Sequence, residues 1–472
     1  MLRNFSDWQY LPRGQLALLQ NKDQGVIVMF QSEGESNLSF QRQAWNTEHL
    51  DDKTKALLNE DAEVFLHQSL STPCLTALSE SNGSYLTDLQ GKRYLDFHGN
   101  AVHQVGYGHP KVIAAIKDQL DTMPFCPRRF TNEPAVALAK RLTKLAPGDL
   151  NKLLFAPGGT GAIGMALKLA RAVTGKFKTI SLWESFHGAS LDAISIGGEA
   201  LFRKGAGPLL PGSEHVPPPD PLEGPWPEMD PEEWANMSAR YVEYVLEREG
   251  GDVGAVIAET IRWTPYVPPK SYWQRVRAAC DKHGALLILD EIPSGLGRTG
   301  KMFVCEHFDI VPDILVIGKG LGGGVFPLAA MIAREEFNVS ADQALGHYTH
   351  EKSPAACAAG LATLDVIESE DLLSKTITLG SYVKERLTSL QQKYTIIYEV
   401  RGIGLVIGLV LRNADGSRAN EAAEKILYDA LGKGLSFKIT MGSILTLTPP
   451  LTISQSEIDD ALAILESCFK SL

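Results

Sequence analysis

The sequence predicts an α/β protein with a mainly parallel sheet and a second, smaller α/β domain at its C-terminal end. In the middle of the chain, short apolar runs alternate with stretches whose apolar residues recur at helical spacing. This alternation is typical of parallel strands that helices cover on both faces. The chain has 472 residues, of which 44% are hydrophobic and 21% charged. That is the mix of a globular protein with a large core.

The expected elements follow one another in a regular order. A hairpin is predicted at 83–97, turning at Gln90-Gly91, and helices follow at 111–120 and 133–145. The main sheet takes strands at 152–156, 179–182, 255–259, 286–289 and 314–317, with helices at 162–174 and 271–283. Beyond residue 354 we expect a long helical segment, a strand pair at 396–411 and a final helix at 456–470.

These elements suggest three parts of the chain. Residues 1–82 are interpreted as an N-terminal extension and arm, with a helix-like stretch at 51–70. Residues 83–353 form the large domain, and residues 354–472 the small C-terminal one. A stretch rich in proline and glycine at 205–231 is interpreted as a long surface loop of the large domain.

Charge and composition exclude several classes of function. The formal net charge of -11 argues against binding to nucleic acid, which needs a basic surface. No apolar run approaches the ~18 residues of a membrane span, and no secretory leader is recognised. The six scattered cysteines form no CxxC pair, so we expect thiols in a reducing cytoplasm and no metal site.

A glycine-rich segment at 295–300 matches GxGxxG and nearly matches a phosphate-binding P-loop. Both interpretations fail on context. Met302 follows Lys301 where a P-loop needs serine or threonine. A dinucleotide fold needs glycines directly at a strand end and an acid about 20 residues later, whereas Glu306 and Asp309 come too early.

Two charged residues follow expected buried strands. Asp290 ends the run 286–289, at the edge where ligands of open α/β sheets bind, although a turn cap would explain it equally simply. Lys319 comes just after the run 314–317 and precedes several glycines. Burial lowers the pKa of a lysine, which Schiff-base chemistry requires. The glycines allow the backbone to pass close to a ligand.

Two further motifs stand at strand ends. Gly159 and Thr160, between the strand 152–156 and the next helix, offer amides and a hydroxyl for a phosphate, or merely a tight turn. Phe186-His187 follows the strand 179–182 and offers an aromatic face, or simply core packing. A lysine, a counter-acid, a phosphate cup and a stacking ring are together the parts that a pyridoxal phosphate enzyme supplies.

From about Gly83 to the C-terminus, the chain resembles the class III aminotransferases of the pyridoxal phosphate fold type I. The segments 289–300 and 317–324 carry the resemblance. It implies a mainly parallel seven-stranded sheet in the large domain and a homodimer with sites at its interface. By this resemblance, Lys319 forms the Schiff base with the cofactor and Asp290 pairs with its pyridinium nitrogen. Ile292 and Phe186 pack against the cofactor ring, with His187 beside them. Gly159 and Thr160 bind the phosphate, and Thr349 reaches the phosphate of the neighbouring subunit.

The sequence departs from that family at three places. Thr446 stands where many members have an arginine that holds an α-carboxylate, so we expect a reacting amine without one. Gly161 replaces a usual glutamate, and Thr260 replaces a proline after Glu259. These changes suggest a specialised subgroup.

The segment 97–110 is similar to the stretch that marks the amine phospholyases and the related aminophosphonate ammonia-lyases of this family. Asn100, in that stretch, and Glu259 are candidate substrate residues. Arg128 and Arg129 are further candidates, because guanidinium groups suit a phosphate or phosphonate dianion; a surface or interface salt bridge is the alternative.

We therefore expect a pyridoxal phosphate-dependent lyase that eliminates ammonia from a small primary amine carrying a phosphonate or phosphate. The favoured substrate is 1-hydroxy-2-aminoethylphosphonate, which would yield phosphonoacetaldehyde. The alternative is a transaminase that moves an amino group to pyruvate or another keto acid, whose carboxylate Arg262 would hold. A non-catalytic cofactor-binding protein is the third interpretation, and Lys319 argues against it.

Overall fold

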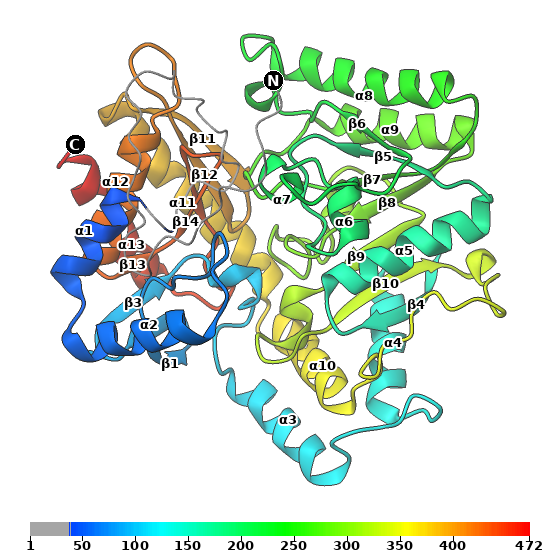
Figure 1. The fold of residues 1–472 in the computed structure, drawn as a ribbon, viewed down its shortest axis with the longest axis horizontal. Helices are drawn as coiled ribbons and strands as arrows, with labels where there is room; N and C mark the ends of the chain where they lie inside the picture. The colour runs from blue at the N-terminus through cyan, green and yellow to red at the C-terminus, as the bar shows by residue number, and fades with distance from the viewer. Residues whose placement is uncertain (1–36, 38) are drawn as a thin grey trace, which may run out of the picture. The chain divides into compact units, whose positions relative to one another are not determined.

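The computed structural model describes Asn37 and residues 39–472 (Figure 1). The described residues belong to one compact unit. Residues 1–36 and 38 of the expected N-terminal extension lie outside them. The extension's described part holds α1 (Phe40–His49) and α2 (Asp52–Val64), and the second of these matches the helix-like stretch.

The main sheet has seven strands in the order β4-β10-β9-β8-β7-β5-β6. Its strands are β4 (Leu150–Ala156), β10 (Ala329–Arg334), β9 (Ile314–Ile317), β8 (Leu286–Asp290), β7 (Val253–Glu259), β5 (Lys178–Leu182) and β6 (Ser213–Val216). β10 runs antiparallel to both of its neighbours, and the other pairs are parallel. The predicted α/β class with a mainly parallel seven-stranded sheet is confirmed.

Helices cover both faces of this sheet, because its central strands are apolar on both sides. Ile257 and Ile288 pack in the cluster with α5 (Gly159–Thr174). Their neighbours Val256 and Leu287 face the opposite cluster. That cluster includes residues of α8 (Pro231–Arg248) and α9 (Lys270–His283). Successive side chains of these strands are buried on opposite faces of the sheet, which explains why the strands appear in the sequence as continuous apolar runs.

The interpretation of 205–231 as one long loop was wrong in part. The segment contains β6 and the short 3-10 helix η2 (Pro221–Glu223). Among the described strands, β6 lies at the edge of the sheet and pairs with β5, and its sequence Ser-Glu-His-Val is mostly polar. An edge strand of this kind carries no apolar run by which the sequence would reveal it.

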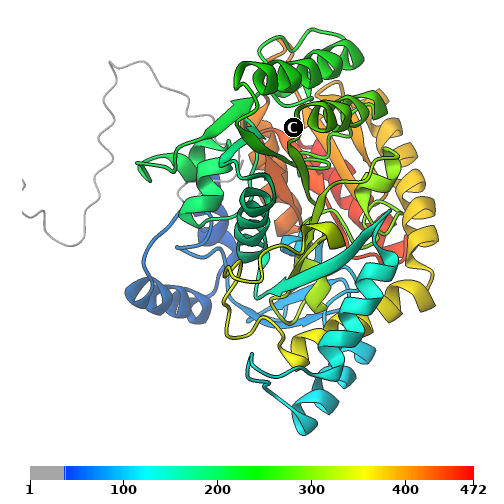
Figure 2. The ribbon, with the colours of Figure 1, turned by 90° about the vertical axis from the view of Figure 1, so that its right-hand side faces the viewer.

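Two smaller sheets complete the fold. One has the order β1-β2-β3-β13, and the other β11-β12-β15-β14. Their strands are β1 (Leu78–Asn82), β2 (Tyr85–Asp88), β3 (Arg93–Asp96), β11 (Ile397–Ile403), β12 (Val406–Leu411), β13 (Leu435–Ser436), β14 (Lys438–Thr440) and β15 (Ile444–Leu447). β2 and β3 form the predicted hairpin, and β13 pairs in parallel with β3. The light-blue strands of this sheet therefore lie beside the orange and red C-terminal segments (Figures 1 and 2). The domain boundaries at residues 82 and 353 stay a prediction.

The remaining α-helices are α3 (Pro110–Thr122), α4 (Glu133–Leu145), α6 (Leu191–Ile196), α7 (Ala200–Arg203), α10 (Pro354–Ser369), α11 (Leu372–Lys393), α12 (Asn420–Gly432) and α13 (Gln455–Phe469). The helices predicted from periodicity begin and end within a few residues of these bounds. In the part of the chain that the structure describes, no helix combines the length and the apolar character needed to cross a bilayer. All six cysteines are free thiols.

Candidate active site

A cavity of about 370 Å³ lies at the carboxyl ends of the central strands. Glu259 ends β7, Asp290 ends β8, and Lys319 comes two residues after the end of β9; all three line the cavity. The first residues of α5, Gly159 and Thr160, line it as well. Four strand-end motifs that are distant in the sequence therefore meet at one edge of the sheet, as the parallel topology requires.

Asp290 is held in place by two groups. Its Oδ2 lies 2.8 Å from Nδ1 of His187, and its Oδ1 accepts a hydrogen bond of 3.0 Å from the backbone N–H of Ile292. Both the carboxylate and the imidazole are almost fully buried. This carboxylate is oriented and shielded from solvent, which suits it to hold a cationic ring nitrogen.

Lys319 stands on a strained backbone. Its φ of 46° lies in the left-handed region, which costs a non-glycine residue roughly 1–3 kcal/mol and tends to occur at functional sites. The chain around it is tightly packed. A Cβ atom on Gly318 would lie 3.2 Å from the Ala329 side chain, and one on Gly320 would overlap the Gln104 side chain. The glycines beside Lys319 are therefore required by close approach.

The N-terminus of α5 forms a cradle for an anion. Gly158 caps this 16-residue helix without any side-chain hydrogen bond to its first turn, which leaves the first N–H groups for a ligand. A Cβ atom on Gly159 would lie 2.7 Å from Cδ1 of Ile292. At φ 131°, Gly188 leaves room for Thr160, whose Oγ1 would be 2.3 Å from an added Cβ.

Apolar groups line the cavity between the cradle and Asp290. Ile292 is 9% exposed and packs against both Gly159 and Gly318. Phe186 is 37% exposed, and its ring centroid lies 4.4 Å from that of Phe202. Both side chains line the cavity, as a site for a flat aromatic ligand requires.

A buried ion pair lies beside Asp290. Glu259 is the register partner of Asp290 across β7 and β8. Burial raises the pKa of Glu259, and the guanidinium of Arg262, whose Nε is 4.0 Å from Oε2, opposes that shift. Arg262 also donates to the backbone oxygen of Glu184. Among the described residues its buried Nη1 has no hydrogen-bond partner, so it has N–H groups to offer to a ligand.

A turn after β3 closes another side of the cavity. Asp96 accepts hydrogen bonds from the backbone N–H groups of His98 and Gly99, at 3.1 and 3.0 Å, and from the Tyr107 hydroxyl at 2.6 Å. This network holds Asn100 at a φ of 46°. His98 and Asn100 both line the cavity. Burial first, and then nearby lysines, lower the pKa of His98 to about 3, so its imidazole is neutral near pH 7.

The sheet β11-β12-β15-β14, called the smaller sheet below, supplies lining residues that the sequence analysis missed. Lys438 and Thr440 of β14 line the cavity, together with Met441. Thr446 is fully buried, and its hydroxyl lies 2.8 Å from that of Thr440. In the sequence, Lys438 is marked only as a lysine within the mostly apolar segment 435–441. Nothing near it in the sequence connects it to Asp290 or Lys319.

Three predicted residues do not line this cavity. Arg128, Arg129 and Thr349 lie on exposed loops, and Arg128 contacts Nδ1 of His347. The resemblance assigned Thr349 to a neighbouring subunit, so its absence from the cavity of a single chain leaves that role a prediction. The same holds for the two arginines.

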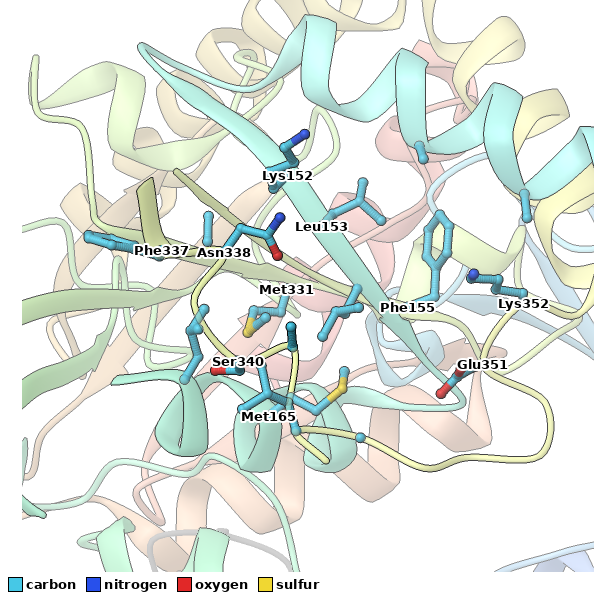
Figure 3. A pocket seen from close by; sticks show the side chains of 18 of the residues that line it. Lys152, Leu153, Phe155, Met165, Met331, Phe337, Asn338, Ser340, Glu351 and Lys352 are labelled. Atoms are coloured by element: carbon cyan, nitrogen blue, oxygen red, sulfur yellow. The ribbon is translucent and has the colours of Figure 1, made fainter. Parts of the chain in front are cut away.

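A larger cavity, of about 530 Å³, lies along β4 and β10 (Figure 3). Its lining includes Leu153, Phe155, Met331 and Phe337, with Lys152 at one side. It contains none of the residues predicted to bind a cofactor. Size therefore does not identify the active site of this protein, whereas the set of reactive groups does.

The geometry defines an α/β protein with a lysine, a buried aspartate–histidine pair and an anion cradle at the carboxyl edge of its main sheet. Comparisons with known proteins agree with this. The model of the family "Aminotransferase class-III" matches residues 67–469. The chain belongs to the class III aminotransferase family.

Individual relatives differ in the reactions that their names state. The (R)-1-hydroxy-2-aminoethylphosphonate ammonia-lyase of Vibrio splendidus is 51% identical over 93% of this chain and 94% of its own. The isoleucine 2-epimerase of Lentilactobacillus buchneri is 33% identical over 89% and 96%. An amine transaminase from an uncultivated Pseudomonas species, solved with pyridoxal phosphate bound, is 31% identical, covers 86% of this chain and 98% of its own, and superposes with a TM-score of 0.81.

Proposed function

We propose that this chain is a pyridoxal phosphate-dependent ammonia-lyase that converts (R)-1-hydroxy-2-aminoethylphosphonate to phosphonoacetaldehyde and ammonia. The observation that carries the proposal is the 51% identity to the Vibrio splendidus protein of that name, which extends over nearly the full length of both chains. The neutral, buried Thr446 supports it, because the favoured substrate has no α-carboxylate.

The residues of the cavity fit the cofactor. The cradle at the N-terminus of α5 suits its phosphate, and Ile292 and Phe186 suit its ring. Asp290 would hold the protonated ring nitrogen, and His187 fixes the orientation of that carboxylate. Lys319 would bond the cofactor at rest. When bound, the cofactor supplies an electron sink for the carbon that carries the substrate nitrogen.

Lys319 then acts as the base and the acid of the reaction. Its amine removes a proton from the carbon that bears nitrogen, and its ammonium returns that proton to the hydroxyl on the neighbouring carbon. The carbon–oxygen bond breaks and water leaves, so a carbon–carbon double bond forms next to the nitrogen. The released aminovinylphosphonate takes up water and yields phosphonoacetaldehyde and ammonia. One water is lost and one is gained, and no oxidant or reductant is needed.

A transaminase is the second candidate, favoured by the Pseudomonas amine transaminase and by Arg262. The free Nη1 of Arg262 is a donor that a keto acid's carboxylate can use. The Glu259 carboxylate beside it disfavours this use, since it already compensates the guanidinium charge.

We further propose that two copies of the chain form a cytoplasmic homodimer. The exposed loop that carries Thr349 borders the cavity of Figure 3, which Gly346 and Glu351 help to line. We propose that Thr349 of one copy contacts the phosphate cradle of the other, as the family resemblance implies. The free cysteines suit a reducing compartment. Light scattering on the purified protein tests the dimer, and a monomer at assay concentration contradicts it.

The test of the reaction is a product assay on the purified enzyme with (R)-1-hydroxy-2-aminoethylphosphonate, with and without pyruvate. The lyase predicts ammonia and aldehyde in equal amounts and independent of pyruvate. Alanine that forms only when pyruvate is present would identify a transaminase instead.

A further inference from the structure

The cavity has two ends with different chemistry. One end, at the main sheet, carries Asp290, Lys319 and the α5 cradle, which together would hold the cofactor. The other end is formed by β14 of the smaller sheet, where Lys438 and Thr440 line the cavity. The proposed function assigns no group to that strand, although the substrate must lie against it.

The placement of Lys438 follows from strand geometry. Side chains alternate across a strand, and Ile439 points into the core with no exposed surface, so Lys438 and Thr440 share the opposite face. Thr446 is the register partner of Lys438 on β15, and its hydroxyl bonds to that of Thr440. This face therefore presents an ammonium group above two linked hydroxyls.

Lys438 also lies close to the reacting end of the cavity. The charges of both Lys438 and Lys319 lower the pKa of His98, so both ammonium groups lie near the same imidazole. In the proposed substrate the phosphorus is three bonds from the nitrogen. His98, Lys319 and Lys438 all line the same cavity, so a dianion three bonds away from the reacting nitrogen lies within the space that Lys438 borders.

We propose that Lys438 binds the phosphonate group of the substrate and selects aminophosphonates over amines that lack this group. The inference rests on the proposed function and deepens it. A lysine binds a phosphate-like group as a point charge, whereas an arginine fork matches planar carboxylates as well. Arg262 is the weaker candidate because Glu259 shares its charge and the Glu184 carbonyl takes one of its donors.

The test compares Lys438→Met and Lys438→Arg with the wild type, all as holoenzymes. Lys425→Met is the matched control, since Lys425 is partly buried on α12 and paired with Asp429, away from the cavity. Calorimetry measures the dissociation constant of 2-hydroxyethylphosphonate, which keeps the phosphonate and lacks the amine. Steady-state kinetics with the aminophosphonate measure KM and kcat.

Loss of a charge-assisted contact predicts that Lys438→Met weakens binding of 2-hydroxyethylphosphonate, and raises KM, by about 10- to 100-fold. We expect kcat to change less than about threefold and the cofactor's visible spectrum not to change. Lys438→Arg should recover most of the affinity, and Lys425→Met should match the wild type.

Two results would overturn the inference. One is a Lys438→Met variant whose dissociation constant and KM stay within about twofold of the wild type. The other is a wild type that does not bind 2-hydroxyethylphosphonate. If instead the wild type binds this probe through Lys438 but releases no ammonia from the aminophosphonate, the phosphonate site stands and the proposed reaction fails.

Discussion

The two ends of the cavity differ in how the chain builds them. At the main sheet, each group stands at or just after the end of a buried strand, on a backbone constrained by glycines and by buried hydrogen bonds. At the smaller sheet, Lys438 is one side chain on a three-residue strand. The comparison suggests that the rigid end fixes the cofactor chemistry shared by a family, while the other end is free to select the substrate.

The largest expected effect is at Lys319. Lys319→Ala removes the group that bonds the cofactor and carries the proton, so we expect kcat to fall by at least about 10³-fold. The visible absorbance of the lysine-bound cofactor should disappear, while the circular dichroism spectrum stays that of the wild type. Residual activity with an intact visible band would break the assignment of the reactive lysine.

Asp290→Asn comes next. The amide keeps the shape but has no charge to stabilise a protonated ring nitrogen, so we expect kcat to fall by about 10²- to 10³-fold. The same change should shift the cofactor spectrum, which a loss confined to the substrate end would not do. A variant with wild-type kcat would show that the aspartate is only a turn cap.

The His98 turn links the two ends and gives a pH dependence. The pKa of the His98 imidazole is about 3 in the folded protein and 6.5 in the free side chain, so the unfolded chain binds the proton more tightly. Stability is therefore full above pH 6.5 and is lost as the pH falls toward 3. Between pH 7 and 5 we expect His98 to account for a decrease of about 2 kcal/mol in the free energy of unfolding.

Urea denaturation at the two pH values measures this decrease. His98→Asn should be less sensitive to pH by about that amount, and His103, whose pKa is also about 3, keeps its own contribution in both proteins. Identical pH profiles for the variant and the wild type would contradict the burial of a neutral imidazole here.

The smallest expected effect is at Ile292. Ile292→Val removes one methyl group from the side chain that packs on Gly159 and Gly318. A loss of about 1 kcal/mol predicts roughly five-fold weaker binding of the cofactor, with the dissociation constant of 2-hydroxyethylphosphonate unchanged. Equilibrium dialysis and calorimetry measure the two. Weakening of both ligands alike would show that the ends are not independent.

The same comparison explains what the sequence could predict. The sequence predicts that Asp290, Lys319 and Gly159 lie together, because each follows an apolar strand and parallel topology brings strand ends together; all three line one cavity. Lys438 was missed because a lone lysine in a short strand carries no local sign of what it faces. The edge strand β6 was missed because its mostly polar sequence contains no apolar run.

Residues on exposed loops mark the other limit of prediction. Arg128 was proposed from the chemistry of its guanidinium group and Thr349 from resemblance, and neither lines the cavity of this chain. A single chain can show whether strand-end residues lie together, whereas a role that needs a second subunit stays a prediction.

The most direct test of the proposed elimination is the identity of its carbon product. Phosphorus and proton NMR should follow the reaction of (R)-1-hydroxy-2-aminoethylphosphonate in D₂O without any keto acid. The account predicts phosphonoacetaldehyde, in which the carbon next to phosphorus has lost its hydroxyl group and gained one deuterium. In a parallel reaction that contains pyruvate as amino acceptor, a product that keeps this hydroxyl group beside a new carbonyl would contradict elimination and indicate transfer of the amino group instead.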